Sequence, residues 1–155
     1  MEEDLRIILT RGDVQEYYKL VDSVDVNYTT NSGSSFLHYA IASSAFSEDV
    51  VMDLIRRNID INKLDRDKRS PLECCCEYNR YNIAKVLLEK GAIVNTIDRW
   101  GNNPLWRATF NRNAELVELL MRYGANPQNV NKAGKTPLDF AKQINNEKLI
   151  ELLTK

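Results

Sequence analysis

Apolar residues in this chain recur in pairs of short amphipathic segments separated by polar turns, and residues 65–97 show the pattern most clearly. Within each segment the apolar side chains are spaced i, i+3, i+4, which lines one face of a helix. The inward positions of the two segments are Leu72, Cys75 and Cys76, then Ile83, Val86 and Leu87. The pattern predicts a short helix over residues 71–77 and a second over residues 83–89.

Polar and turn residues mark where these two helices begin and end. The Ser70 side chain is suited to cap a helix start, and Pro71 is tolerated at the first helical position. Gly91 ends the second helix, because helix ends favour a residue that tolerates positive φ. Asn58 stands where Gly91 stands one unit later, and asparagine is the best substitute for glycine there.

The same short phrase returns at a fixed interval. Leu72, Leu105 and Leu138 each follow a proline and are 33 residues apart. An earlier copy places Leu37 35 residues before Leu72, and two extra residues near Ala45 account for the longer step. A period of this length predicts a solenoid, in which one supersecondary unit is stacked repeatedly. Solenoids present extended surfaces that usually bind another molecule.

We expect a single domain of about five such units, with atypical first and last copies because their outer faces meet water. The predicted units are residues 1–29, 30–64, 65–97, 98–130 and 131–155.

The phrase resembles the ankyrin repeat, in which a Thr-Pro-Leu-His helix start follows a polar turn and a Gly-Ala segment follows the second helix. Residues 91–95 and 131–138 carry the resemblance best, and it spans nearly the whole chain. It implies an all-α solenoid of helix–turn–helix units joined by β-turn or hairpin loops.

The chain departs from the ankyrin pattern at two positions that affect local geometry. The family histidine is present only as His38, and Lys68 replaces a turn glycine, which predicts a looser turn.

The charge balance and the cysteines limit the classes of partner and the cellular compartments that we expect for this protein. A net charge of −1 provides no general attraction to nucleic acid or to a membrane surface. The acidic N-terminus does not resemble a signal peptide, and no apolar run reaches the ~18 residues that a membrane span needs. We therefore expect a cytoplasmic protein that is a monomer when free.

We interpret Cys74, Cys75 and Cys76 as small buried side chains, with a redox or metal role as the alternative.

No catalytic set is apparent, and we predict neither enzymatic activity nor a cofactor or metal. His38 is the sole histidine, and the resemblance implies that it bonds neighbouring backbone and locks adjacent units. Asp65 and Asp98 occupy equivalent turn positions, where carboxylates accept bonds from the local backbone. A general base would need a nucleophile and an orienting partner within reach.

Recognition is the better-supported chemistry. The resemblance implies that turn tips and the exposed sides of the first helices form a concave binding face. The candidate partner-binding residues are Arg66, Asp67, Arg69, Glu77, Tyr78, Arg99, Trp100, Asn102, Phe110, Asn111, Lys132 and Lys135.

The aromatic residues of this face have alternative interpretations. Trp100 at a turn tip is either a partner anchor or packed on Arg66 or Arg69 of a neighbouring turn. Phe110 and Tyr78 either extend an aromatic patch or fold over the helix ends. We expect Trp106 to fill the core or the space between repeats.

The resemblance implies a protein-binding module. Residues 102–108, 123–127 and 134–141 further resemble small bacterial ankyrin proteins, some of which are immunity proteins that neutralise a toxin. That resemblance favours neutralisation of a cognate toxin by covering its active site. The alternative is a scaffold or effector that binds a host or regulatory protein.

Overall fold

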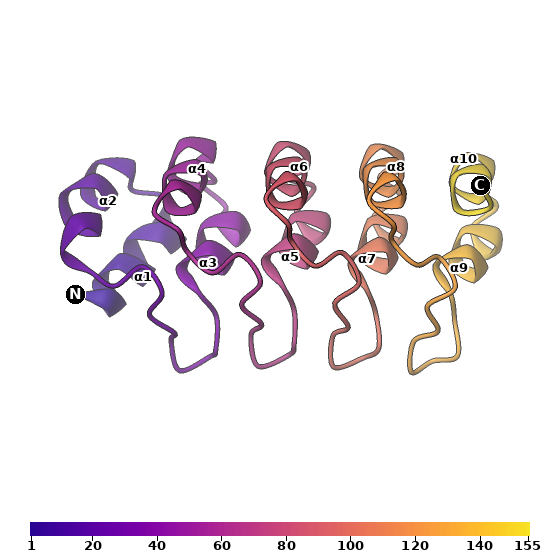
Figure 1. Ribbon diagram of the computed structural model, residues 1–155, viewed down its shortest axis with the longest axis horizontal. Coiled ribbons are helices and arrows are strands. Elements are labelled where there is room, and N and C mark those ends of the chain that lie inside the picture. The colour runs from indigo at the N-terminus through magenta and orange to yellow at the C-terminus, as the bar shows by residue number, and fades with distance from the viewer.

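The computed structural model describes residues 1–155 and consists of helix pairs arranged in a single row (Figure 1). It contains ten α-helices, one short 3₁₀ helix and no strand, so the expected all-α solenoid is confirmed. The elements are α1 (Glu2–Arg11), α2 (Val14–Leu20), η1 (Val21–Ser23), α3 (Phe36–Ala42), α4 (Glu48–Arg56), α5 (Pro71–Glu77), α6 (Tyr81–Glu89), α7 (Pro104–Phe110), α8 (Ala114–Arg122), α9 (Pro137–Gln143) and α10 (Glu147–Leu153).

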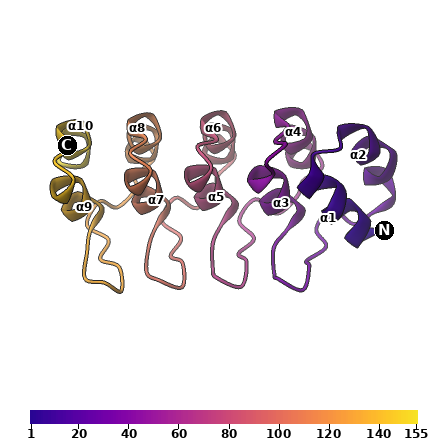
Figure 2. The same ribbon diagram turned by 180° about the vertical axis from the view of Figure 1, so that it is seen from behind.

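The row has three layers. The odd-numbered helices lie side by side as an inner layer, and the even-numbered helices form an outer layer above them (Figures 1 and 2). Hairpin loops project from the opposite side of the inner layer. We call the tips of these loops the fingers; they are residues 30–34, 65–69, 98–102 and 131–135.

Local signals in the sequence set most helix boundaries. Ser70 caps α5 by accepting a hydrogen bond from the Glu73 backbone N–H, as expected. Helix α6 begins at Tyr81, two residues before the predicted start at Ile83. Its first turn carries Tyr81 and Asn82, which are not fully buried, so the apolar spacing does not reveal that turn.

The last three of the four fingers are each built around one carboxylate or amide, whereas the hydroxyl groups of Thr30 and Ser32 bond the backbone of the first. Asp65 accepts two backbone hydrogen bonds within its own finger, both at 2.9 Å. Asp98 accepts two at 2.8 Å, and Asn131 accepts two at 3.0 and 3.1 Å in the last finger. The predicted role of Asp65 and Asp98 in fixing the turns is confirmed.

The expectation of a looser turn at Lys68 is wrong. Lys68 adopts φ 61°, close to Gly134 at φ 70°, and its backbone N–H reaches the Asp65 carbonyl at 2.9 Å. The equivalent bond from Gly134 is also 2.9 Å. The hydrogen bonds to Asp65 hold the turn closed, so lysine bears the strain of a left-handed backbone.

Consecutive units are joined by hydrogen bonds that repeat with the period. One backbone bond links each finger to the next, from Arg66 to Ser32 (3.3 Å), Arg99 to Asp67 (2.8 Å) and Lys132 to Trp100 (2.9 Å). On the loops after the outer helices, three asparagine side chains accept a backbone N–H of the following unit. These are Asn27 from Asp60 (2.8 Å), Asn62 from Ile93 (2.9 Å) and Asn95 from Asn126 (2.8 Å).

The core lies between the two helical layers and between successive units. Leu37, Leu72 and Leu105 of the repeated phrase are completely buried, whereas Leu138 in α9 is only half-buried. Within residues 1–155, α7 is the only inner helix that packs against α9. The same leucine therefore buries less surface in the last unit.

All three consecutive cysteines are buried and free, as expected. Helix α5 is enclosed by α3, α7 and α6, so even the third cysteine faces protein. Burial raises the pKa of the Cys74 thiol to about 12 and also raises those of Cys75 and Cys76. The thiols stay protonated at neutral pH, which makes them poor nucleophiles and poor metal ligands.

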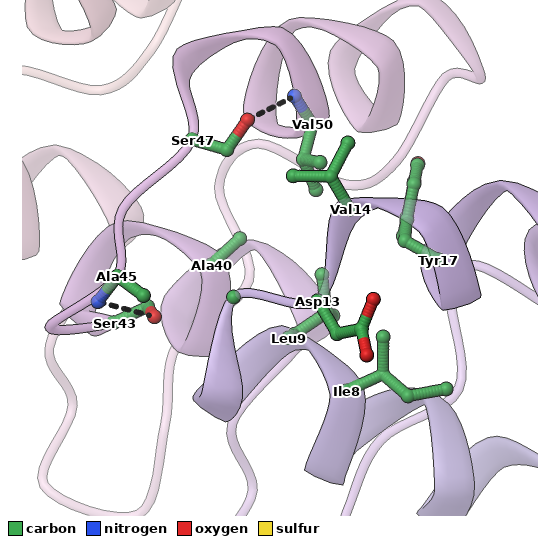
Figure 3. Close-up of a pocket in the computed structure, with 11 residues that line it drawn as sticks. Ile8, Leu9, Asp13, Val14, Tyr17, Ala40, Ser43, Ala45, Ser47 and Val50 are labelled. Atoms are coloured by element: carbon green, nitrogen blue, oxygen red, sulfur yellow. Dashed lines mark hydrogen bonds between the residues drawn. The ribbon is translucent and has the colours of Figure 1, made fainter.

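The two extra residues of the second unit form a structural contact. Five residues, 43–47, separate α3 from α4, where three separate α5 from α6. Ser43 donates a hydrogen bond to the Thr10 carbonyl at 3.1 Å, and the backbone of Gly12 lies directly against Ala45. Figure 3 shows this segment facing the turn between α1 and α2 across a mostly apolar hollow. The volume of the hollow is about 10 Å³.

The third unit holds the same segment from the other side. The Arg80 guanidinium donates to the carbonyls of Ile41 (3.3 Å) and Ser43 (3.2 Å) and stacks 3.9 Å from the ring centre of Phe46. The segment 43–47 thus joins the first unit to the third.

We expect Gly12→Ala to destabilise the protein more than Gly124→Ala does. Both glycines have positive φ, at 70° and 81°, so both substitutions add backbone strain of about 1–2 kcal/mol. A Cβ at residue 12 would lie 2.3 Å from the Ala45 carbonyl oxygen, whereas nothing lies within 4 Å of a Cβ at residue 124. Overpacking should add about 1–3 kcal/mol at residue 12, measured by urea unfolding. Equal losses of stability in the two variants would show that the segment 43–47 moves away from the added Cβ at little energetic cost.

Candidate functional site

The predicted partner-binding residues lie along one side of the row. We call this side the inner face; it consists of the fingers and the exposed side of the odd-numbered helices. The fingers carry Arg66, Asp67, Arg69, Arg99, Trp100, Asn102, Lys132 and Lys135, and the C-terminal ends of α5 and α7 carry Glu77, Tyr78, Phe110 and Asn111. None of these residues is fully buried.

Trp100 is exposed at the tip of its finger, with 44% of its surface accessible. The guanidinium of Arg99 lies 5.3 Å from the centre of its ring and also pairs with Asp67 of the preceding finger at 2.8 Å. The alternative prediction was that Trp100 packs on Arg66 or Arg69 of a neighbouring finger. It is wrong about the partner. The neighbouring residue Arg99 reaches the ring instead, because its ion pair holds it between the two fingers.

Arg69 and Glu77 form an ion pair. The Arg69 guanidinium bonds Asp65 at 2.9 and 3.0 Å and reaches Glu77 at 3.4 Å. This pairing anchors the finger to the end of α5. Both side chains are half-buried, so they supply a restrained polar edge to the inner face.

Two of the predicted contact residues serve the stack itself. The Asn111 amide donates to the carbonyls of Cys76 (2.9 Å) and Glu77 (2.8 Å), which satisfies backbone acceptors at the end of α5. The side-chain amide oxygen of Asn102 accepts a hydrogen bond from the side-chain amide of Asn131 at 3.0 Å, which links two fingers. Both amides therefore have partners within the protein.

An aromatic cluster lies on the inner face where α7 meets α9. The ring centres of Trp106, Phe110 and Phe140 are 5.3–5.8 Å apart in all three pairings. Such distances are favourable for aromatic pairs. Trp106 also donates its indole N–H to the Lys135 carbonyl at 3.4 Å. The expectation that Trp106 fills the space between repeats is confirmed.

Phe110 leaves much of this cluster open to solvent, with 53% of its surface exposed. Sequence reasoning identified Phe110 but missed Phe140, and it grouped Phe110 with Tyr78, which is in none of the aromatic pairs. The spacing of Trp106 and Phe110, i and i+4, could have indicated a shared helix face. Nothing in the sequence indicated that Phe140 would meet them.

The only histidine of the chain has a structural role. The His38 Nδ1 accepts a hydrogen bond from the Ser35 backbone N–H at 3.2 Å, and its Nε2 bonds the Arg69 carbonyl of the next finger at 3.1 Å. This confirms the expected link between adjacent units. Burial lowers the pKa of His38, so the ring stays neutral.

At the equivalent position of the third unit, a buried carboxyl replaces the histidine. Glu73 is fully buried, and Arg107 of α7 donates to it at 3.2 Å and to Asp98 at 3.4 Å. Burial, aided by the charge of Asp98, raises the pKa of Glu73 to about 8 against the opposing effect of Arg107. Glu73 is therefore mostly protonated at neutral pH, and Asp98 balances the charge of Arg107.

The structure contains no group of three or more His, Cys, Asp or Glu side chains arranged to hold a metal ion. The apolar hollow beside Gly12 has a volume of about 10 Å³, the space of about one water molecule, which is too small for a substrate. No helix has the length and apolar character needed to cross a bilayer.

The repeat of finger, inner helix and outer helix matches a known family. Residues 7–98 and residues 93–155 each match a family model that describes three consecutive ankyrin repeats. The chain belongs to the ankyrin-repeat family. Ankyrin repeats are protein-binding modules and are typically non-catalytic, so the chemistry expected of this face is protein recognition.

A curated relative shares part of the ankyrin region. Over 70 residues the chain is 44% identical to the Ankyrin repeat and LEM domain-containing protein 1 homolog of Caenorhabditis elegans. The match covers 41% of this chain and 10% of that protein. The expected similarity to bacterial toxin-immunity proteins is not shown by these comparisons.

The pKa of Glu73 predicts a specific dependence of stability on pH. Because the pKa is about 8 in the folded protein and ordinarily 4.5, stability should fall as pH rises through this window. The fall should not exceed about 1.4 kcal/mol per pH unit for one proton. Glu73→Gln should remove most of it, as measured by urea unfolding between pH 7 and 8, above the ordinary pKa of histidine and below that of the cysteine thiols.

Glu77→Gln is the matched control, because Glu77 is a half-exposed carboxyl on the same helix. It should retain the pH dependence of the wild-type protein. Identical slopes for Glu73→Gln and wild type would contradict the assignment of a protonated Glu73.

Proposed function

We propose that this ankyrin-repeat protein is a non-catalytic module that holds a partner protein against its inner face. The observation that carries the proposal is the exposure of large aromatic side chains there, above all Phe110 beside Trp106 and Phe140, with Trp100 on a finger. Aromatic residues that are clustered and accessible are typical of binding anchors, because a partner that covers their rings gains several kcal/mol.

The rigidity of the inner face supports the same function. Each finger is closed by side-chain hydrogen bonds, and neighbouring fingers are joined by a backbone bond and, at Asp67 and Arg99, by an ion pair. A surface that is already ordered loses little conformational entropy when it binds. Ordered fingers therefore favour binding of a partner without rearrangement of the face.

Neutralisation of a cognate toxin is the narrower form of this function, and a scaffold or effector role is the alternative. The toxin-immunity hypothesis rests on the resemblance to small bacterial ankyrin proteins. The curated relative is instead an ankyrin repeat and LEM domain-containing protein of Caenorhabditis elegans. No contact within the inner face distinguishes the two, so the proposal is protein binding. A cytoplasmic location remains part of it, supported by three free thiols, which suit a reducing compartment.

Replacing Arg99 and Trp100 together with alanine should reduce capture of the partner while leaving the melting temperature within a few degrees of wild type. The two side chains are exposed at a finger tip and contribute little to the core, as is usual for surface positions. The measurement is quantitative mass spectrometry of proteins crosslinked to the wild-type and variant chains in lysate of the source organism.

Tyr123→Ala is the control, because Tyr123 is an exposed aromatic residue just after the outer helix α8. It should leave capture unchanged. The proposal would be wrong if capture persisted in the double variant and in Phe110→Ala but failed in Tyr123→Ala.

A further inference from the structure

Charge is distributed unequally between the two sides of the solenoid. The fingers contain six basic and three acidic residues, a net charge of +3, whereas the whole chain carries −1. The five outer helices contain nine acidic and five basic residues, a net charge of −4. The near-neutral total therefore conceals a basic finger edge and an acidic outer layer.

The three acidic residues of the fingers are all engaged within the protein, and Asp65 pairs with Arg69 of its own finger. Asp65 and Asp98 are buried in their turns, where they accept backbone hydrogen bonds. Asp67 is paired with Arg99. The finger cations that join none of the ion pairs of the chain are Arg66, Lys68, Lys132 and Lys135, and all four are exposed.

The basic edge and the aromatic cluster are continuous at the last finger. The Trp106 indole bonds the backbone carbonyl of Lys135, so the finger that carries Lys132 and Lys135 rests on the cluster. Phe140 follows in α9, the helix that this finger leads into. An exposed apolar surface thus has two unpaired lysines beside it.

We propose that the inner face of the last two units binds a protein segment in which acidic residues flank a large apolar side chain. The apolar side chain covers Phe110 and its cluster, while the carboxylates pair with Lys132 and Lys135. The inference rests on the proposed function and adds the chemistry of the partner. Complementary charge of this kind raises the association rate and selects among partners, and the aromatic contact supplies most of the affinity.

A protein segment fits this surface better than a nucleic acid does. The acidic outer helices and the carboxyl of Asp139 at the start of α9 oppose a continuous phosphate backbone. A segment of protein presents its carboxylates locally and brings the apolar group that the cluster requires. Single-stranded nucleic acid could stack on the rings, so it is tested directly.

The test is selection of random displayed peptides on the whole chain. We expect enrichment of peptides that combine net negative charge with a large apolar residue. Phe110→Ser should weaken binding of a synthetic enriched peptide by at least about tenfold, and so should Lys132→Glu with Lys135→Glu. Added salt should weaken wild-type binding, because the lysine contacts are exposed.

Each variant has a matched control on the outer side. Tyr123→Ser removes another exposed aromatic residue, and Lys85→Glu with Lys148→Glu makes the same change in net charge on α6 and α10. Both should bind the peptide as the wild type does. Thermal melting of every variant, followed by circular dichroism, separates loss of binding from loss of folding.

Three results would overturn the inference. One is enrichment of basic or neutral peptides, or of none. Another is equal loss of binding in the inner-face variants and their controls. The third is displacement of the enriched peptide by a single-stranded oligonucleotide, which would assign the surface to nucleic acid. If capture of the native partner still depended on Trp100 and Phe110, the proposed protein-binding function would stand and only the inferred chemistry of the partner would be wrong. If capture did not depend on these residues either, the proposed function would be wrong as well.

Discussion

No unit of this solenoid can bury its apolar surface alone, and the rest of the structure depends on that constraint. Each inner helix covers the leucine of the preceding unit, so Leu37, Leu72 and Leu105 are buried, whereas Leu138 is only half-buried. Helices of seven to ten residues, such as those of this chain, are marginal in isolation. Stacking of neighbours therefore stabilises both the helices and the row.

Polar contacts between units determine how the neighbours sit on one another. The asparagine bonds, the finger-to-finger bonds and His38 repeat a small set of geometries along the chain. Two contacts break the period, namely the insertion gripped by Arg80 and the buried Glu73 that meets Arg107. Both occur at junctions with the third unit. The stack is therefore stabilised there by side-chain contacts that the other junctions do not repeat.

The binding surface follows from the same architecture. The outer helices and the stacked faces bury the core, whereas the finger tips and the ends of the inner helices keep exposed side chains. In this chain they carry exposed aromatic and basic side chains on one rigid edge. The mean composition conceals this asymmetry, since opposite charges on the two sides nearly cancel in the sum.

The sequence alone determined the period, most helix boundaries, the turn-fixing role of Asp65 and Asp98 and the link made by His38. These features are local or repeat at equivalent positions, so pattern reasoning reaches them. Only the tertiary structure decided that Phe140 joins Trp106 and Phe110, that Asn111 is engaged in capping α5, and that Lys68 adopts the glycine conformation. A repeat period predicts which equivalent positions stack, but the contacts between non-equivalent side chains depend on the exact rotation and spacing of neighbouring helices.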